Sequence, residues 1–254
     1  MITLYQFAFS HYCEKVRWAL DYKGLAYTCR NLIPGPHLAV TRRLASRSDV
    51  PILVIDGAVL QDSTAILTYL DERFPERPLT PADPREAQAA LAWEERLDEE
   101  IGVLLRRWFY FHALPDRRRA QRFLLDGAPW YGRPLYALIF PGVRTAMRKA
   151  MDIHAESAAD AEIGMLTALG VLDQALAERR YLVGDRFTRA DLTACALLSP
   201  YCAPGRAEAD VTARFPAHVR KMRDSHRQRP FFTWVEEIYA AHRRGEAPHG
   251  HGAR

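Results

Sequence analysis

The sequence predicts an α/β region followed by an all-helical region. The first 75 residues alternate short β-type runs with segments of helical period, whereas most of the chain after residue 85 shows helical period alone. Between the two regions, four prolines fall at 75–84, a density that no helix or strand interior tolerates. We therefore expect one domain at 1–76 and a second at 85–244, joined by a linker at 77–84.

Each element of the first region follows from the spacing of its apolar residues. These residues alternate with polar ones in the strand candidates and recur every three or four positions in the helix candidates. Asp56-Gly57 favours a tight turn between two of the strands. The expected elements are a strand at 2–7, a helix at 13–23, a strand at 27–32, a hairpin at 51–56 and 58–60, and a helix at 63–74. This order predicts a small mixed sheet, parallel where the first helix crosses over.

The second region is helical, with one long interruption. The patterns at 85–112 and 156–178 are amphipathic along their whole length. Prolines and glycines break the pattern at 113–143, which we expect to be an irregular, aromatic-rich connection. The remaining expectations are a capping box at Thr188 and Asp191, a last helix at 229–239, and a disordered tail at 245–254.

Composition excludes several classes of protein. Of the 254 residues, 48% are hydrophobic and 26% charged, which is typical of a folded globular chain. No apolar run approaches the roughly 20 residues of a membrane-spanning helix, and the N-terminus lacks the pattern of a secretory signal. We therefore expect a soluble, cytoplasmic protein without a membrane partner. The four cysteines form no C-x-x-C pair, so no metal site or disulfide framework is expected.

Positive charge is concentrated in one part of the chain. Residues 102–154 hold ten Lys or Arg and three Asp or Glu, a net charge of +7, and many aromatic residues lie between them. Basic residues interleaved with aromatic ones are typical of nucleic-acid surfaces. A solvated face, or a funnel that attracts an anionic ligand, explains the same pattern. We therefore expect a solvated face or an anion-attracting funnel, and no nucleic-acid partner.

Five motifs occur in an order and at spacings that resemble those of the cytosolic glutathione transferases, in particular bacterial-like members of serine type. The motifs are FSHYCEKVRWALDYKG at 9–24, VP at 50–51, DSTAI at 62–66, the Pro-rich linker and FTRADL at 187–192. The resemblance implies a thioredoxin-like N-terminal domain with a mixed four-stranded sheet that holds glutathione. It further implies an all-helical C-terminal domain for the second substrate, a homodimer, a role in detoxification and no cofactor beyond glutathione as co-substrate.

Ser10 is the candidate catalytic residue. It stands just before the first predicted helix, where a ligand would meet a hydroxyl donor and unpaired helix amides. Both groups stabilise a thiolate, so they would lower the pKa of a bound thiol from its free value of about 8.5. The resembling serine-type classes place a serine three residues before a cysteine, as Ser10 and Cys13 stand here. A plain helix cap is the alternative interpretation of Ser10. Tyr5 or Tyr12 is the alternative donor to the thiolate, since other members of the family use a tyrosine near this strand end.

Cys13 allows a different chemistry. Glutaredoxin-like and cysteine-type members use a cysteine here for glutathione-dependent thiol reduction. Cys13 falls at the second cysteine position of their C-x-x-C motif, and Ser10 fills the first. We therefore expect Cys13 to be a buried helix residue and keep the thiol reductase as an alternative function.

The resemblance assigns further residues to glutathione. It implies that Val50-Pro51 is a cis peptide whose valine backbone pairs with the cysteinyl part of the tripeptide. Asp62 and Ser63 open a helix, where they would hold the γ-glutamyl ammonium and carboxylate; plain N-capping is the alternative. His37 matches the position of the group that binds the glycyl carboxylate, with Arg42 and Arg43 as alternatives to it.

The second substrate is expected to be a small apolar electrophile. Tyr12, Trp108 and Phe111 are the candidate lining residues of its pocket, because aromatic faces suit planar electrophiles, although such side chains more often pack in a core. The sequence thus predicts an enzyme that activates glutathione as a thiolate and conjugates it to this electrophile. The alternative from another class is a related binding or interaction module without efficient catalysis.

Overall fold

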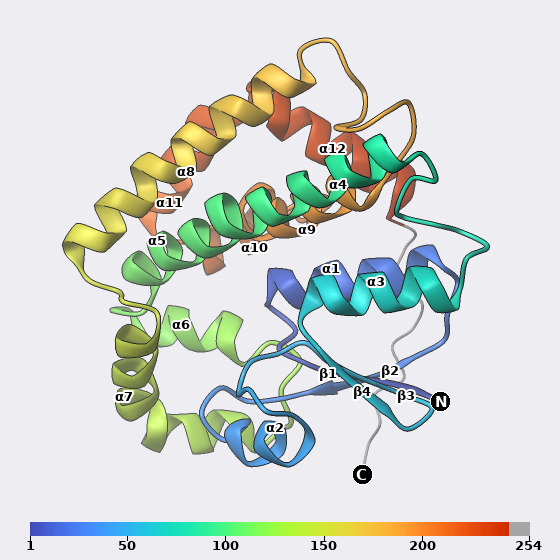
Figure 1. Ribbon diagram of the computed structural model, residues 1–254. Helices are drawn as coiled ribbons and strands as arrows, with labels where there is room; N and C mark the ends of the chain where they lie inside the picture. Colours follow the sequence, from blue (N-terminus) through green and yellow to red (C-terminus); the bar gives the residue numbers. More distant parts are fainter. Residues whose placement is uncertain (244–254) are drawn as a thin grey trace.

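The computed structural model describes residues 1–243, which form an α/β region and a larger helical region (Figure 1). The tail expected at 245–254 lies outside the described residues. The elements of the α/β region are β1 (Ile2–Gln6), α1 (His11–Tyr22), β2 (Thr28–Asn31), α2 (Leu38–Leu44), β3 (Ile52–Ile55), β4 (Ala58–Gln61) and α3 (Ser63–Arg73).

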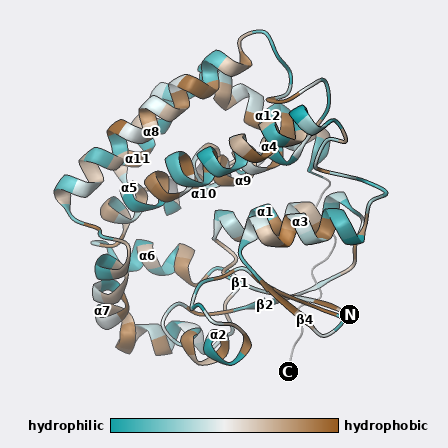
Figure 2. Ribbon diagram, in the orientation of Figure 1, coloured by the Kyte–Doolittle hydropathy of each residue, from teal (hydrophilic) through white to brown (hydrophobic). Residues whose placement is uncertain are grey.

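The four strands form one mixed sheet in the order β2-β1-β3-β4. β1 pairs with β2 in parallel, and β3 is antiparallel to both β1 and β4. Leu4 stands at the centre of this register, opposite Cys29 on one side and Leu53 on the other. β3 and β4 are largely hydrophobic, whereas β2 is mostly polar (Figure 2). The four-stranded mixed sheet of a thioredoxin-like domain is therefore confirmed.

Helices α1 and α3 pack on each other between the sheet and the helical region (Figure 1). Their inner faces are fully buried because apolar residues recur at helical spacing. Val16 and Leu20 of α1 and Ile66 and Leu70 of α3 belong to the same core cluster as Leu4. The beginnings of both helices therefore have fixed positions relative to the sheet.

The helical region contains more helices than the sequence predicted. Its elements are α4 (Pro84–Leu97), η1 (Asp98–Val103), α5 (Leu104–Ala113), α6 (Arg117–Leu124), α7 (Gly132–Ala150), α8 (Ala155–Leu176), α9 (Arg189–Cys202), α10 (Glu208–Arg214), α11 (Ala217–His226) and α12 (Pro230–His242). The pattern at 85–112 is one helical run, as expected, but its middle part, η1, has π-helical hydrogen bonding. None of the helices within residues 1–243 has both the length and the apolarity needed to span a bilayer.

The expectation of an irregular connection at 113–143 was wrong, because α6 and most of α7 lie there. Pro134 falls in the first turn of α7, where its missing N–H costs nothing. Pro141 lies inside α7 and cannot donate to the carbonyl of Ala137. Arg117 of α6 supplies the missing donor, with 3.0 Å from its guanidinium to the Ala137 oxygen. The helix therefore continues through a proline that the sequence pattern treats as a break.

Helix α9 is buried along nearly its whole length and packs against α1, α4 and α12. The expected capping box is confirmed: the Thr188 side chain accepts from the first turn of α9, and the Asp191 carboxylate accepts from the Thr188 amide at 2.8 Å. Asp191 also accepts from the amide of Leu182 at 2.8 Å, which ties the preceding loop to the helix.

A buried ion network joins the two regions. Lys15 of α1 lies 2.6 Å from Glu94 of α4, and Arg189 of α9 is paired with the other oxygen of the same carboxylate. All three side chains are at most 2% exposed. Thr64, the second residue of α3, donates to Glu94 at 2.9 Å and accepts from Lys15 at 3.1 Å. Burial alone would raise the pKa of Glu94, but Lys15 and Arg189 hold it below its ordinary value.

The network predicts a large effect for Glu94→Gln. The substitution leaves two buried cations without their shared carboxylate, so the free energy of unfolding should fall by about 3–5 kcal/mol in urea denaturation. Glu95→Gln, one residue on and exposed, is the matched control and should change it by less than about 0.5 kcal/mol. Equal effects of the two substitutions would show that the network does not stabilise the fold.

Candidate active site

A cleft of about 2100 Å³ opens where the α/β region meets the helical region. Ser10, Tyr12, His37 and Val50 are among its lining residues. A smaller pocket of about 270 Å³ adjoins it, and Tyr12, Asp49, Val50 and Arg106 line both. The smaller pocket is completed by residues that include Pro51, Asp62 and Ser63. The structure thus brings together every residue that the sequence assigned to glutathione.

Ser10 is the N-cap of α1. Its Oγ accepts from the amide of Cys13 at a long 3.4 Å, and its own amide donates to the Phe7 carbonyl at 3.0 Å. The cap leaves the hydroxyl hydrogen available, because Oγ only accepts in this bond. A hydroxyl donor and the positive end of a helix therefore meet at the wall of the cleft.

The two tyrosines that the sequence left as alternatives differ in their surroundings. Tyr12 donates its hydroxyl to the backbone carbonyl of Asp98 at 2.9 Å, and burial raises the pKa of its phenol. Its proton is therefore committed to another partner. Tyr5 is half-buried on β1 and lines the large cleft.

Cys13 is completely buried and does not line the cleft. Burial raises the pKa of its thiol. A buried, protonated thiol is a poor nucleophile. This environment fits the expected role of Cys13 as a core residue of α1.

The Val50-Pro51 peptide bond is cis, as the resemblance predicted. Asp62 caps α3: its Oδ1 accepts from the amides of Thr64 and Ala65 at 3.0 and 3.1 Å, and its other oxygen lies 3.5 Å from Arg47. Ser63 is buried at the same helix start, and no described residue forms a hydrogen bond with its hydroxyl. The Ser63 hydroxyl is therefore free to bind a ligand, whereas the Asp62 carboxylate is already used to cap α3.

His37 lines the cleft and has backbone partners. Its Nδ1 accepts from the amide of Gly35 at 3.0 Å, which leaves Nε2 as the donor, and burial lowers its pKa although backbone hydrogen bonds with Ser48 and Gly35 oppose this shift. Of the two arginines considered as alternatives, Arg42 lines the cleft and Arg43 does not.

The assignment of Trp108 and Phe111 to the pocket wall needs correction. Neither lines the cleft; Trp108 is fully buried and donates to Glu162 of α8 at 2.8 Å. Phe109 and Tyr110 line the wall instead. The reason is that α5 packs closely against α8, and the face that carries Trp108 is turned toward α8 rather than toward the cleft.

The structure adds two residues that sequence reasoning missed. Arg106 of α5 lines both pockets, with its guanidinium 5.8 Å from the centre of the Tyr12 ring, and no carboxylate among residues 1–243 forms an ion pair with it. Arg106 is one of ten basic residues at 102–154, so only its place on the helix distinguishes it. His11 lines the cleft beside Ser10, and its buried Nε2 has no partner among the described residues.

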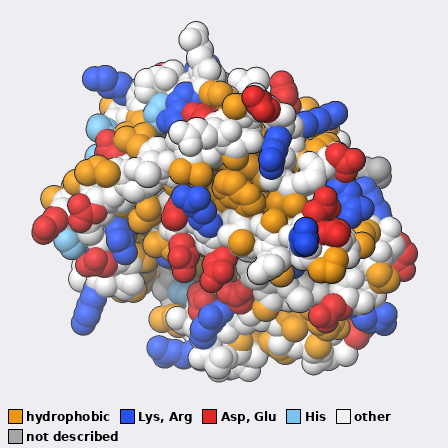
Figure 3. Space-filling model, turned by 45° about the horizontal axis from the view of Figure 1, so that its top comes forward, with side chains coloured by type: hydrophobic (Ala, Val, Ile, Leu, Met, Phe, Trp, Pro, Cys, Tyr) orange, Lys and Arg blue, Asp and Glu red, His pale blue; other side chains and the backbone are white. Residues whose placement is uncertain are grey.

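Most of the aromatic residues in the basic block at 102–154 lie away from its exposed arginines. Tyr110, Phe123, Tyr136 and Phe140 are buried, and Trp130 and Tyr131 are the exposed aromatic residues of the block. On the face shown in Figure 3, Lys and Arg side chains are interspersed with Asp and Glu. The charge pattern of the sequence therefore arises mainly from the outer sides of amphipathic helices.

Comparison with known proteins agrees with this arrangement. The models of the glutathione S-transferase N-terminal domain and C-terminal domain match residues 4–78 and 135–220, together more than half of the chain. The chain belongs to the glutathione S-transferase family. Glutathione S-transferase 1 of Dianthus caryophyllus is 43% identical over 85 residues, which are 32% of this chain and 38% of that protein.

Other members of the family vary in name. A stringent starvation protein A homolog of Pasteurella multocida is 37% identical over 84 residues, covering 33% of this chain and 40% of that protein. Among solved structures, a glutathione S-transferase of Methylobacterium radiotolerans in complex with glutathione sulfonate has a TM-score of 0.58 at 23% identity, covering 91% of this chain and 92% of that one. The structural match shows the shared fold, and each sequence alignment spans less than half of the relative's length.

His11 gives the site a pH dependence of stability. Burial, together with the nearby charges of Arg106 and Lys15, lowers its pKa from the ordinary value of 6.5 to about 3. Between these pH values the unfolded chain binds a proton that the folded chain does not, so stability is lost as the pH falls. His11 should contribute up to about 1.4 kcal/mol per pH unit to this slope. Urea denaturation from pH 7 to 4 should show a smaller slope for His11→Gln; identical slopes would mean that His11 is protonated in the fold.

Proposed function

We propose that this protein is a glutathione transferase that binds glutathione across the two joined pockets and stabilises its thiolate with Ser10. The observation that carries the proposal is that the N-termini of α1 and α3 open on these pockets, on either side of the cis Val50-Pro51 bond. Two helix N-termini at one site favour a ligand with two negative groups, as a thiolate and a γ-glutamyl carboxylate provide.

The chain's own groups supply complementary contacts along the tripeptide. The Ser63 hydroxyl takes the γ-glutamyl carboxylate, and the outer oxygen of Asp62 takes the ammonium, in competition with Arg47. The backbone of Val50 pairs with the cysteinyl unit. His37 donates from Nε2 to the glycyl carboxylate, with Arg42 as a second donor. That a solved structure of this fold is a complex with glutathione sulfonate supports glutathione as the ligand.

The reaction follows from this placement. Ser10 donates its hydroxyl hydrogen to the sulfur, which lowers the pKa of the thiol and makes the thiolate abundant at neutral pH. The thiol proton leaves to water when the thiolate forms. The sulfur then attacks an electrophilic carbon held against the aromatic wall. A sulfur electron pair makes the carbon–sulfur bond, either as a leaving group departs with its own pair or as the π pair of an activated double bond shifts to the adjoining atom, which later takes up a proton from water.

The electrophile is a small, largely apolar molecule that also carries an anionic or electron-rich oxygen. Phe9, Phe109, Tyr110 and Phe123 provide apolar surface in the large cleft, and Trp130, 87% exposed, stands at its edge. Arg106 is a charged residue on this wall, and no carboxylate among residues 1–243 forms an ion pair with it. An unpaired guanidinium in a largely apolar cleft favours an oxygen-bearing ligand, because its own desolvation is then compensated.

Thiolate absorbance in the ultraviolet, recorded as glutathione binds, tests the proposal. The wild-type protein should lower the pKa of bound glutathione by at least about one unit, and Ser10→Ala should abolish most of this shift. Ser10→Ala should also reduce kcat by about 10²-fold. Tyr5→Phe is the matched control and should leave both values within about twofold. Binding without ionisation in the wild type would instead indicate a non-catalytic glutathione-binding module.

The role of Arg106 has its own test. Arg106→Met should raise KM for an electrophile with a carboxylate by about tenfold and leave KM for an uncharged analogue within about twofold. Arg118→Met removes an exposed arginine of α6 that lies outside the cleft and should change neither value. Equal effects of Arg106→Met on the two electrophiles would contradict the assignment.

The remaining properties implied by the family stay proposals. We propose that the protein is cytoplasmic and forms a homodimer. Sedimentation equilibrium would test the dimer. Glutathione-dependent thiol reduction through Cys13 is the less favoured activity, because that thiol is buried. Full transferase activity in Cys13→Ser would exclude a catalytic role for Cys13.

A further inference from the structure

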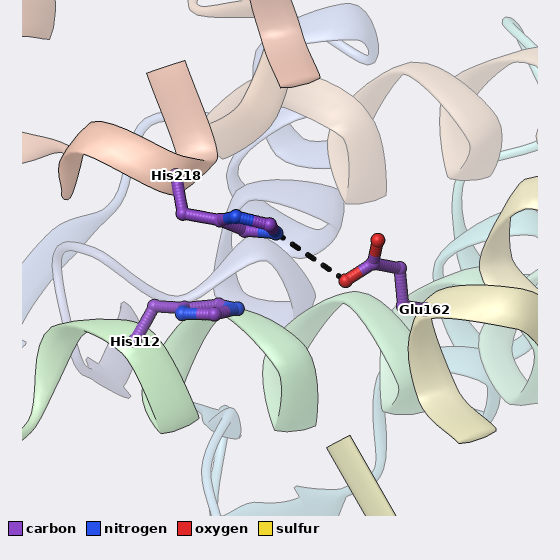
Figure 4. A group of neighbouring side chains, drawn as sticks. All are labelled: His112, Glu162 and His218. Carbon is purple, nitrogen blue, oxygen red and sulfur yellow. Dashed lines mark hydrogen bonds and ion pairs between the residues drawn. The ribbon is translucent and has the colours of Figure 1, made fainter. Parts of the chain in front are cut away.

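Three helices bring metal-binding side chains together at a place separate from the cleft. His112 of α5, Glu162 of α8 and His218 of α11 each offer one ligand atom, and these atoms all lie within 4.8 Å of one another (Figure 4). His218 Nε2 is 3.4 Å from a Glu162 carboxylate oxygen. None of the three residues lines the large cleft.

The side chains are arranged for convergence on one point. The imidazole rings of His112 and His218 are stacked, with 4.3 Å between their centres and 26° between their planes. Figure 4 shows the outer edges of both rings directed toward Glu162. Around a tetrahedral zinc ion the ligand atoms are about 3.3 Å apart, because each bond is about 2.0–2.2 Å long. The ligand atoms lie within 4.8 Å of one another, so binding one ion requires side-chain rotations that bring them closer together.

A hydrogen bond from a neighbouring residue holds one of the three side chains in place. The indole N–H of Trp108 donates to the Glu162 carboxylate at 2.8 Å and fixes its orientation. Such support of a ligand by a second hydrogen bond is a regular feature of metal sites.

Access from solvent is also present. The side chain of His218 is 50% exposed and that of Glu162 30% exposed. An ion at this point can therefore enter from water and keep water as its remaining ligands. Two imidazoles and one carboxylate suit Zn²⁺ and neighbouring transition metals rather than Mg²⁺ or Ca²⁺, which prefer oxygen ligands.

We propose that His112, Glu162 and His218 form a three-ligand site for a divalent transition-metal ion of the Zn²⁺ type, completed by water. The ion links α11 to α5 and α8 on the outer side of the helical region. Phe215, three residues before His218, lines the cleft, and so does Phe109, the residue after Trp108. A bound ion therefore braces the wall that faces the second substrate, and this role does not depend on the transferase proposal.

The test is zinc binding by the full chain, measured by isothermal titration calorimetry after removal of metal by a chelator. His249 and His251 stand near the C-terminus and can bind metal themselves, so the reference protein carries His249→Asn and His251→Asn. We expect one Zn²⁺ per chain and a rise of the melting temperature on zinc addition. Co²⁺ in place of Zn²⁺ should give the visible absorption bands of a low-symmetry site with nitrogen and oxygen ligands.

Variants in this reference protein locate the ion. His218→Asn and Glu162→Gln, which keeps an acceptor for Trp108, should each weaken zinc binding by at least about tenfold. His154→Asn is the matched control, since His154 also lies beside a carboxylate, 3.3 Å from Asp152, but without a second histidine. It should leave the affinity unchanged. No zinc binding by the reference protein, or equal affinity in His218→Asn, would overturn the proposal.

Discussion

The buried carboxylate of Glu94 is the constraint on which the rest of the structure depends. It neutralises Lys15 from the α/β region and Arg189 from the helical region, in a place where water contributes almost nothing. Because an uncompensated charge there is so costly, the two regions have one favourable relative position. Thr64 binds into the same network, and its neighbour Ser63 opens α3. The network thereby fixes the starts of α1 and α3, which are the two helix ends that face the candidate glutathione site.

The same constraint shapes the cleft wall. Asp98, at the start of η1, lies 2.8 Å from Lys15, and its backbone carbonyl accepts from Tyr12. Gly102 is required beside this contact, because a Cβ there would lie 2.9 Å from Cζ of Tyr12. Helix α5 follows η1 and packs closely against α8, which turns Trp108 toward Glu162. Arg106 and Phe109 line the cleft.

The sequence predicts most of the α/β region because local signals there agree with the tertiary structure. Apolar spacing, the Asp56-Gly57 turn and helix-capping residues all indicate the same elements. Prediction from the sequence fails where contacts between residues far apart in the chain determine the structure. Pro141 is tolerated inside α7 because Arg117 satisfies a distant carbonyl. The pocket wall depends on the packing of α5 against α8, which has no clear sequence signal, and His112, Glu162 and His218 are too far apart in the chain to suggest a cluster.

The central claim is that the network holds the starts of α1 and α3 so that one glutathione molecule spans them. A crystal structure of the complex with glutathione tests this claim most directly. The account predicts that the sulfur lies within about 3.5 Å of Ser10 Oγ and that the γ-glutamyl carboxylate lies at hydrogen-bond distance from Ser63. A sulfur placed against Tyr5, or a tripeptide bound away from the smaller pocket, would contradict it.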